Sequence, residues 1–348
     1  MRLPLLPSLA LLAPLTTALD VEVNLTASID INTTAVAPPT TAEYPDPGEC
    51  TGDCWGHDPG FYQRLSDGRY FRFSTGAGIY IHASDSITGP WEAVGQALPG
   101  GSNISHAGNT NLWAPDISHN PTANLYYMYY SLSALGSRDS VIGVASSADL
   151  TPGSWTDHGA VFSSAVDSPY NAIDPNWIMV NGEQILTFGS YWHGLHQIQL
   201  SSPLAVEDGS EPVNIAYNST GNHSIEASYI FYRLGWWYLT FSSGRAQGYE
   251  ANFPAPGAEY RIVVCRSRTP TGDFVDKAGL SCLTENGGST VLASHGNVFG
   301  PGGQGVFKDF TRGFVVYYHY ANPTIGLNPT QYQFGWNVLK WSDGWPSV

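Results

Sequence analysis

Positive charge is scarce in this chain of 348 residues. Only 14 Lys and Arg stand against 29 Asp and Glu, which gives a formal net charge of −15. Such a chain repels a phosphate backbone, so we expect no nucleic-acid partner. Long amphipathic helical patterns are also missing, which argues against a mainly helical fold.

Long apolar runs are absent after the N-terminus, so we expect no membrane partner. Residues 1–18 are typical of a signal peptide. Arg2 supplies a positive start, residues 3–15 are largely apolar, and Ala18 suits cleavage. A membrane anchor is a poor alternative, because the run is short and prolines interrupt it. The sequence therefore predicts a secreted, extracellular protein.

Cysteine is rare as well, with four in the chain. In an oxidising compartment, Cys50 and Cys54 could close a small loop, and Cys265 and Cys282 a larger one. A metal site is the alternative reading, but no histidine completes either pair. Secretion would also allow glycans on the five sequons, which start at Asn24, Asn32, Asn103, Asn218 and Asn222.

Aromatic residues are missing from residues 19–43, and the stretch 19–48 is rich in Thr, Ala and Pro. We expect this stretch to be a flexible spacer. The rest of the chain, residues 49–348, is rich in aromatics, glycine and proline, which favours strands joined by turns.

Five similar segments follow one another in that remaining part. Each begins with a turn that contains Pro, Gly or an acid, continues into a short apolar strand and ends in a strongly aromatic strand. They are "HDPGFYQRLSDGRYFRFST", "APDISHNPTANLYYMYYS", "IDPNWIMVNGEQILTFGS", "IEASYIFYRLGWWYLTFSS" and "GPGGQGVFKDFTRGFVVYYHY". Further strands follow several copies, so each unit has room for four strands. This predicts an all-β fold, a five-bladed β-propeller.

Acidic residues recur with these units. Asp58, Asp116 and Asp174 lie 58 residues apart, and Glu226 follows. A two-sheet sandwich does not explain this repeat, and the coils of a parallel β-helix would be much shorter. In a propeller the first strand of each blade lines the central axis. The four carboxylates should therefore gather at one end of that axis.

A single Asp-Pro pair is usually a turn, but several clustered carboxylates cost stability and indicate metal binding or acid/base chemistry. Carboxylates alone would suit calcium. An inverting glycosidase needs two carboxyls roughly 6.5–9.5 Å apart, one protonated and one ionised. Apolar neighbours should raise the pKa of Glu226, as a proton donor requires. Trp113 and the "GSYWHG" loop would form pocket walls, whereas Trp177 fits the core.

Several segments in this order resemble glycoside hydrolase family 43, and within it the secreted fungal-type endo-arabinanases. They are "HDP", "LWAPDI", "NAIDPN", "GSYWHG", "IEASYIF", "GPGGQGVF" and "YYHY". The resemblance implies a five-bladed propeller that hydrolyses α-1,5-linked arabinan with inversion and needs no cofactor for the chemistry. It also implies that Asp58 is the general base, Glu226 the general acid, and Asp174 the residue that orients the sugar and modulates the pKa of the acid. The implied contacts with arabinose are Asn171, Ala172, Ile173, Asp174, Ser190, Tyr191 and Trp192.

Two positions differ from the pattern of the family. Relatives often read "GPGH", whose histidine helps to hold a metal ion on the axis, and Gly303 takes its place here. His295 is a weak candidate to replace that histidine as a metal ligand. A structural calcium or sodium ion on the axis therefore remains an open expectation. The acid segment reads "IEAS" where relatives have "IEGP" or "IEAP". The resemblance gives Asp116 no catalytic part, so we expect it to accept backbone hydrogen bonds.

Other functions fit the same scaffold. An exo-acting α-L-arabinofuranosidase or β-xylosidase would differ in the loops that close the cleft. No long insertion in the sequence would block one end of the cleft, which favours endo action. A non-catalytic carbohydrate-binding propeller would lose at least one of the three acids, and none is lost. We expect arabinan and arabino-oligosaccharides as partners and a monomeric protein.

Overall fold

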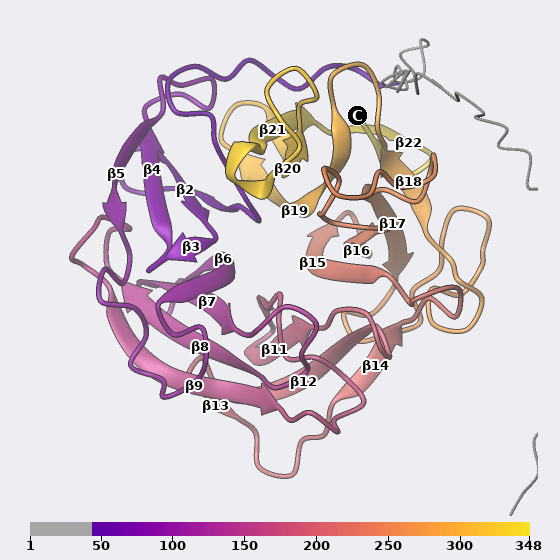
Figure 1. Ribbon diagram of the computed structural model, residues 1–348. Coiled ribbons are helices and arrows are strands. Elements are labelled where there is room, and N and C mark those ends of the chain that lie inside the picture. The colour runs from indigo at the N-terminus through magenta and orange to yellow at the C-terminus, as the bar shows by residue number, and fades with distance from the viewer. Residues whose placement is uncertain (1–43) are drawn as a thin grey trace, which may run out of the picture. The chain divides into compact units, whose positions relative to one another are not determined.

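The structure, a computed structural model, describes residues 44–348. Five β-sheets stand around a central axis like the blades of a propeller (Figure 1). The described part holds strands and one 3-10 helix, η1 (Pro329–Gln331), and none of its helices could cross a membrane. The predicted fold class is confirmed. The predicted signal peptide, most of the predicted spacer, Asn24 and Asn32 lie outside the described residues.

The first two blades are antiparallel sheets in which neighbours in sequence pair. Blade 1 contains β1 (Gly60–Gln63), β2 (Tyr70–Ser74), β4 (Tyr80–Ser84) and β5 (Glu92–Gln96). Blade 2 contains β6 (Asn111–Asn120), β7 (Leu125–Leu132), β8 (Ser140–Ser147) and β9 (Thr156–Ser164). The short β3 (Gly76–Ala77) leaves blade 1 and pairs with β6, which links the two blades.

The remaining blades follow the same plan. Blade 3 contains β10 (Asn176–Val180), β11 (Glu183–Phe188), β12 (Leu195–Ser202), β13 (Ala205–Val206) and β14 (Val213–Ala216). Blade 4 contains β15 (Ile225–Arg233), β16 (Trp236–Ser243), β17 (Arg261–Ser267) and β18 (Ser289–Leu292). Blade 5 has β19 (Phe299–Asp309), β20 (Gly313–Ala321) and β21 (Gln333–Val338), and a hairpin of β22 (Lys340–Ser342) and β23 (Trp345–Ser347) ends the chain.

Aromatic side chains fill the space between neighbouring blades. Trp177 in β10 is 2% exposed and stacks on Tyr129 of blade 2, with ring centroids 6.1 Å apart. It belongs to the core, as the sequence predicts. Such rings bury large apolar areas, so packing between blades contributes to the stability of the ring.

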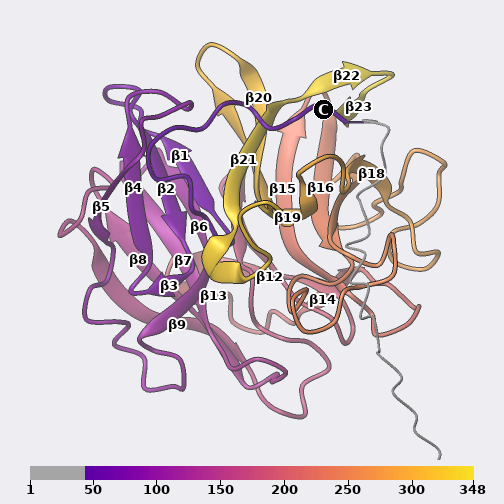
Figure 2. The same cartoon turned by 45° about the horizontal axis from the view of Figure 1, so that its top comes forward.

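The N-terminal part of the described chain closes the ring. Residues 48–56 run beside β21: the amide of Gly48 donates to Trp336 O (2.7 Å) and that of Phe334 to Cys54 O (2.8 Å). The same segment reaches blade 1, because the amide of Asp53 donates to Trp91 O (2.9 Å). In Figure 2 this indigo segment passes in front of β21. The propeller therefore begins before residue 49, the predicted boundary.

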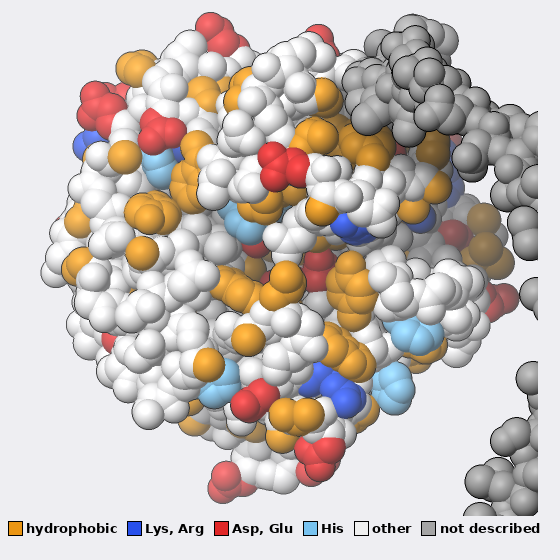
Figure 3. Space-filling view, in the orientation of Figure 1, with side chains coloured by type: hydrophobic (Ala, Val, Ile, Leu, Met, Phe, Trp, Pro, Cys, Tyr) orange, Lys and Arg blue, Asp and Glu red, His pale blue; other side chains and the backbone are white. Residues whose placement is uncertain are grey.

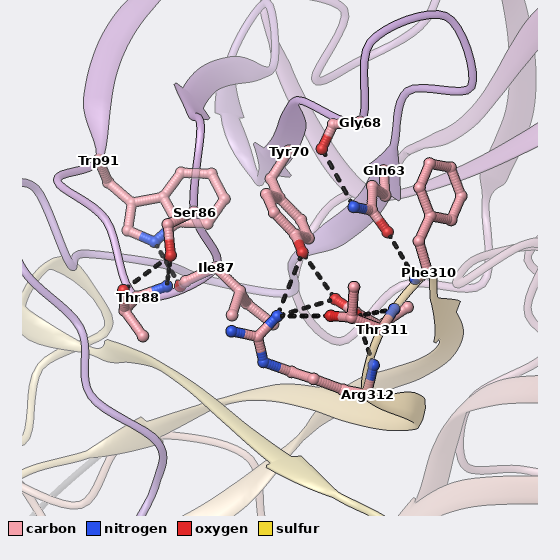
Figure 4. A network of polar contacts seen from close by, with 11 residues as sticks. Gln63, Gly68, Tyr70, Ser86, Ile87, Thr88, Trp91, Phe310, Thr311 and Arg312 are labelled. Carbon is pink, nitrogen blue, oxygen red and sulfur yellow. Dashed lines mark hydrogen bonds and ion pairs between the residues drawn. The ribbon is translucent and has the colours of Figure 1, made fainter.

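Both predicted disulfides are present, Cys50–Cys54 and Cys265–Cys282. The first lies in the closing segment and the second in blade 4. Polar side chains also join blades 1 and 5. Figure 4 shows Gln63 and Tyr70 pointing toward the turn after β19. The Tyr70 hydroxyl donates to Asp309 Oδ2 (2.7 Å), and Gln63 Oε1 accepts from the amide of Phe310 (3.0 Å).

Candidate active site

Five backbone positions with positive φ, one from each blade, surround one end of the axis. All five line the same cavity: Asp58 (φ 42°), Ala114 (44°), Asp174 (55°), Ala227 (55°) and Gly303 (58°). Strand pairing starts or resumes two residues later in every blade, at Gly60, Asp116, Asn176, Tyr229 and Gly305. Non-glycine residues rarely adopt this conformation, and strained residues gather at functional sites.

This arrangement corrects the equivalence predicted from the 58-residue spacing. Asp116 matches Asn176, not Asp58 or Asp174, because it lies two residues after Ala114, the residue of blade 2 that occupies the axial position. Asp116 is 5% exposed, and its Oδ2 accepts from the amide of Trp177 (3.0 Å) and from Asn176 Nδ2 (3.2 Å). Its expected structural part is confirmed.

Asp58 is held in its ionised form by its neighbours. Burial alone would raise its pKa, but His57, His319 and the hydroxyl of Thr75 lower the pKa well below the ordinary value. Thr75 Oγ1 donates to Asp58 Oδ2 (3.3 Å), and His57 Nε2 lies 3.4 Å from the same oxygen. About 25% of the Asp58 side chain is exposed, so an ionised carboxylate faces the opening.

Glu226 has the opposite tendency. It lies in β15 directly before Ala227, and burial raises its pKa above the ordinary value, although hydrogen bonds from Ser190 and Tyr260 oppose the rise. Ser190 Oγ donates to Oε2 (2.5 Å), and the hydroxyl of Tyr260 donates to Oε1. A carboxyl that is buried in this way retains its proton to higher pH and can act as an acid.

Asp174 contacts the segment that carries Glu226. Its Oδ2 accepts from the amide of Ala227 (3.1 Å), next to Glu226. Burial, followed by the charges of Glu226 and Asp58, raises the pKa of Asp174 well above its ordinary value. The three predicted acids therefore share one site, where their charges interact. Figure 3 shows acidic side chains deep in the central hollow of the face seen in Figure 1.

The segment before Asp174 is mostly buried. Asn171, Ala172 and Ile173 are 3%, 0% and 7% exposed. Asn171 Oδ1 accepts from Ser140 Oγ (2.7 Å). These residues shape the floor that carries Asp174, and only small parts of them reach the surface.

The loop after β11 forms one side of the site. Ser190 is buried against Glu226, whereas Tyr191 and Trp192 are partly exposed and have positive φ values of 50° and 38°. The ring of Trp192 lies under the guanidinium of Arg138, 5.5 Å from its centroid. Trp113, also partly exposed, directly precedes Ala114 of the axial ring. Both tryptophans therefore keep part of their side chains exposed and adjoin residues of the site along the chain.

Comparison with known proteins agrees with this geometry. Residues 55–346 match the sequence profile of Glycosyl hydrolases family 43. The chain belongs to glycosyl hydrolase family 43. It is 70% identical to "Arabinan endo-1,5-alpha-L-arabinosidase C" of Emericella nidulans over 88% of this chain and 96% of that protein.

Solved structures of this family have the same fold. An exo-1,5-alpha-L-arabinanase from a bovine ruminal metagenomic library is 28% identical, with a TM-score of 0.73, over 88% of this chain and 98% of that one. An alpha-L-arabinanase of Cellvibrio cellulosa, solved with arabinohexaose, is also 28% identical with a TM-score of 0.73, over 84% of this chain and 95% of that one.

The "GPGG" segment of this family member follows from contacts at the site. A Cβ atom on Gly303 would lie 2.6 Å from Asp58 Oδ1 and 2.7 Å from His319 Nδ1. A Cβ on Gly302 would collide with the ring of Tyr260. A histidine at position 303 cannot therefore coexist with His319 and Asp58 as they are placed here.

A metal ion on the axis, which the family resemblance left open, meets a difficulty. Within residues 44–348, His57, Asp58 and His319 form a group whose ligand atoms lie within 4.8 Å of one another. However, His319 Nδ1 accepts the amide hydrogen of Asp58 (3.0 Å), so the neutral ring carries its proton on Nε2. Neither nitrogen then offers a free lone pair, and the residues do not fit an ion bound directly to His319.

His295, the weak candidate for a metal ligand, is not part of this group. Its ring nitrogens lie 2.9 Å from Ala293 O and 3.0 Å from Pro45 O. Both therefore face carbonyl oxygens, and the ring holds the N-terminal segment.

Sequence reasoning missed three residues of the site. Thr75 directly follows β2, His319 stands in β20 within the "YYHY" segment, and Tyr260 directly precedes β17. They come from second and third strands, so the spacing of first strands does not reveal them. Of the three, only His319 lies in a segment that carries the family resemblance, "YYHY".

Proposed function

We propose that this protein is a secreted endo-1,5-α-L-arabinanase that hydrolyses arabinan with inversion. The observation that carries the proposal is the pair Asp58 and Glu226 at one end of the axis, with pKa values shifted in opposite directions. An inverting hydrolase needs one ionised and one protonated carboxyl on opposite sides of the scissile bond. The arabinanase names of the relatives support the choice of substrate.

Asp58 acts as the general base in this proposal. Its ionised carboxylate takes a proton from a water molecule, whose oxygen attacks the anomeric carbon of the arabinose unit. Thr75 and His57 hold the carboxylate in the orientation that faces the water. The lowered pKa keeps Asp58 ionised even in acidic medium.

Glu226 acts as the general acid. As the bond to the anomeric carbon breaks, its proton moves to the glycosidic oxygen, and the leaving sugar departs as an alcohol. Burial and the charges of Glu226 and Asp58 raise the pKa of Asp174, so Asp174 and Glu226 titrate as an interacting pair, and in this proposal Asp174 modulates the acid and orients the sugar. The amide of Ala227 fixes Asp174 beside the acid.

Internal cleavage is the mode that we propose, with Trp113 and Trp192 offering apolar faces to sugar rings. The protein would act outside the cell as a monomer. Its partly exposed and exposed sequons, Asn103, Asn218 and Asn222, would then be open to glycosylation.

The substitution Glu226→Gln tests the proposal. It keeps the shape of the side chain but removes the transferable proton, so the rate on debranched linear arabinan should fall about 100-fold or more. The matched control is Glu92→Gln, in an exposed position of β5, which should hydrolyse at the wild-type rate. Both variants should have melting temperatures close to that of the wild type.

Chromatography of the products identifies the mode of action. Mixed oligosaccharides from the first minutes are expected for internal cleavage. A single monosaccharide from the start would replace the proposal by an exo-acting enzyme. Binding of arabinan without release of reducing ends by the wild type would leave only a carbohydrate-binding propeller.

A further inference from the structure

The hydroxyl of Tyr260 is directed at the proposed acid from a different strand. Tyr260 directly precedes β17 and is 2% exposed. Its hydroxyl donates to Glu226 Oε1, and no other described acceptor lies within hydrogen-bonding distance of it. A buried phenol with a single partner, and that partner a carboxyl, fixes the rotation of the carboxyl group.

The ring of Tyr260 is itself fixed on both sides. It stacks on His319, with centroids 6.1 Å apart and planes 24° apart, and Gly302 leaves the space that the ring fills. His319 in turn stacks on Tyr332 (5.0 Å) and accepts the amide hydrogen of Asp58. One packed column of rings therefore connects the backbone of the proposed base with the carboxyl of the proposed acid.

The two carboxyl oxygens of Glu226 therefore differ in whether they can carry its proton. Because Tyr260 donates to Oε1, that oxygen must act as an acceptor. Ser190 Oγ, 2.5 Å from Oε2, is a hydroxyl and can accept as well as donate. When Glu226 is neutral, its proton therefore belongs on Oε2, on the side of the loop that carries Tyr191 and Trp192.

We propose that Tyr260 is a positioning residue of the hydrolysis, which holds the proton of Glu226 on Oε2 and keeps it directed toward the leaving oxygen. This inference rests on the proposed function, since it assigns a part to Tyr260 only if Glu226 is the acid. Tyr260 does not contact the reacting atoms and acts through Glu226.

Tyr260→Phe tests the inference, because it removes the hydroxyl and keeps the ring that stacks on His319. The rate on linear arabinan should fall ~10- to 100-fold, part of the contribution of a general acid. An arabinoside with a nitrophenol leaving group needs little protonation, so its hydrolysis should slow less than 3-fold. The alkaline limb of the rate should also move to higher pH, because the lost hydrogen bond had stabilised ionised Glu226.

Tyr318→Phe is the matched control. Tyr318 is equally buried, and its hydroxyl donates to Asn337 Oδ1 (2.6 Å), away from the acids, so both substrates should react at wild-type rates. Equal losses of Tyr260→Phe on both substrates, or no loss on arabinan, would overturn the inference. If the wild-type enzyme cleaves the aryl glycoside but no arabinan, the proposed substrate is wrong. Tyr260→Phe is then tested on glycosides of the accepted sugar that have a good and a poor leaving group.

Discussion

At the scale of single residues, the site depends on backbone positions that most side chains avoid. Asp58 and Asp174 have φ values of 42° and 55°, a conformation that costs on the order of 1–3 kcal/mol each. Both precede a proline, and their carboxylates meet others in a partly buried space. Packing elsewhere in the propeller must offset this conformational strain, because neither residue offsets it by its own contacts.

Gly303 is the position where the close packing around Asp58 can be tested. Gly303→Ala would place a Cβ atom 2.6 Å from Asp58 Oδ1 and 2.7 Å from His319 Nδ1. We expect the rate on arabinan to fall at least ~10-fold, because a shift of about 1 Å in a reacting group is costly. Steady-state kinetics at saturating substrate measure the effect.

Gly221→Ala separates the clash from the backbone strain. Gly221 has nearly the same φ, 56°, but a Cβ there would meet no atom within 4 Å. Gly221→Ala should lose stability through the same backbone strain but keep its activity on arabinan. If both glycine variants keep full activity, the close packing around Asp58 is not needed for hydrolysis.

At the scale of elements, the junction of blades 1 and 5 must hold the ring closed. Tyr70 of β2 reaches Asp309 at the end of β19, and Asp309 is 2% exposed. Tyr70→Phe leaves this buried carboxylate without one donor, which should lower the free energy of unfolding by about 1–3 kcal/mol. Urea unfolding followed by tryptophan fluorescence measures the loss.

Tyr62→Phe is the corresponding control in the paired strand β1. Among the described residues no hydrogen bond is formed by the Tyr62 hydroxyl, so its removal should change stability by less than ~0.5 kcal/mol. Equal losses in the two variants would show that the bond across the junction contributes nothing specific.

The strands themselves could be predicted well from the sequence. Aromatic strands after Pro- or Gly-containing turns identified all five first and second strands, and Trp177 was correctly placed in the core. The offset of Asp116 could not be predicted, because the even spacing of Asp58, Asp116 and Asp174 does not show that the axial residue of blade 2 is Ala114, two residues earlier. Contacts of Tyr260 and His319 depend on strand order across blades, which spacing along the chain does not contain.

At the scale of the whole molecule, the ring gathers acids that are far apart in sequence and gives them different environments. Asp58 faces two histidines and the hydroxyl of Thr75, which lower its pKa, while burial raises the pKa of Glu226. The convergence of the three acids followed from the repeat, but their roles came from the family resemblance. The physical difference between them depends on neighbours from blades 1, 3, 4 and 5.

The central claim is that ionised Asp58 activates water while protonated Glu226 releases the leaving sugar. Proton NMR of the first product from linear arabinan, recorded before the anomers equilibrate, tests it most directly. The α-linked substrate should give the β-anomer first, because water attacks opposite to the leaving oxygen. Initial release of the α-anomer would mean a covalent intermediate and would contradict the assignment of Asp58 as a base.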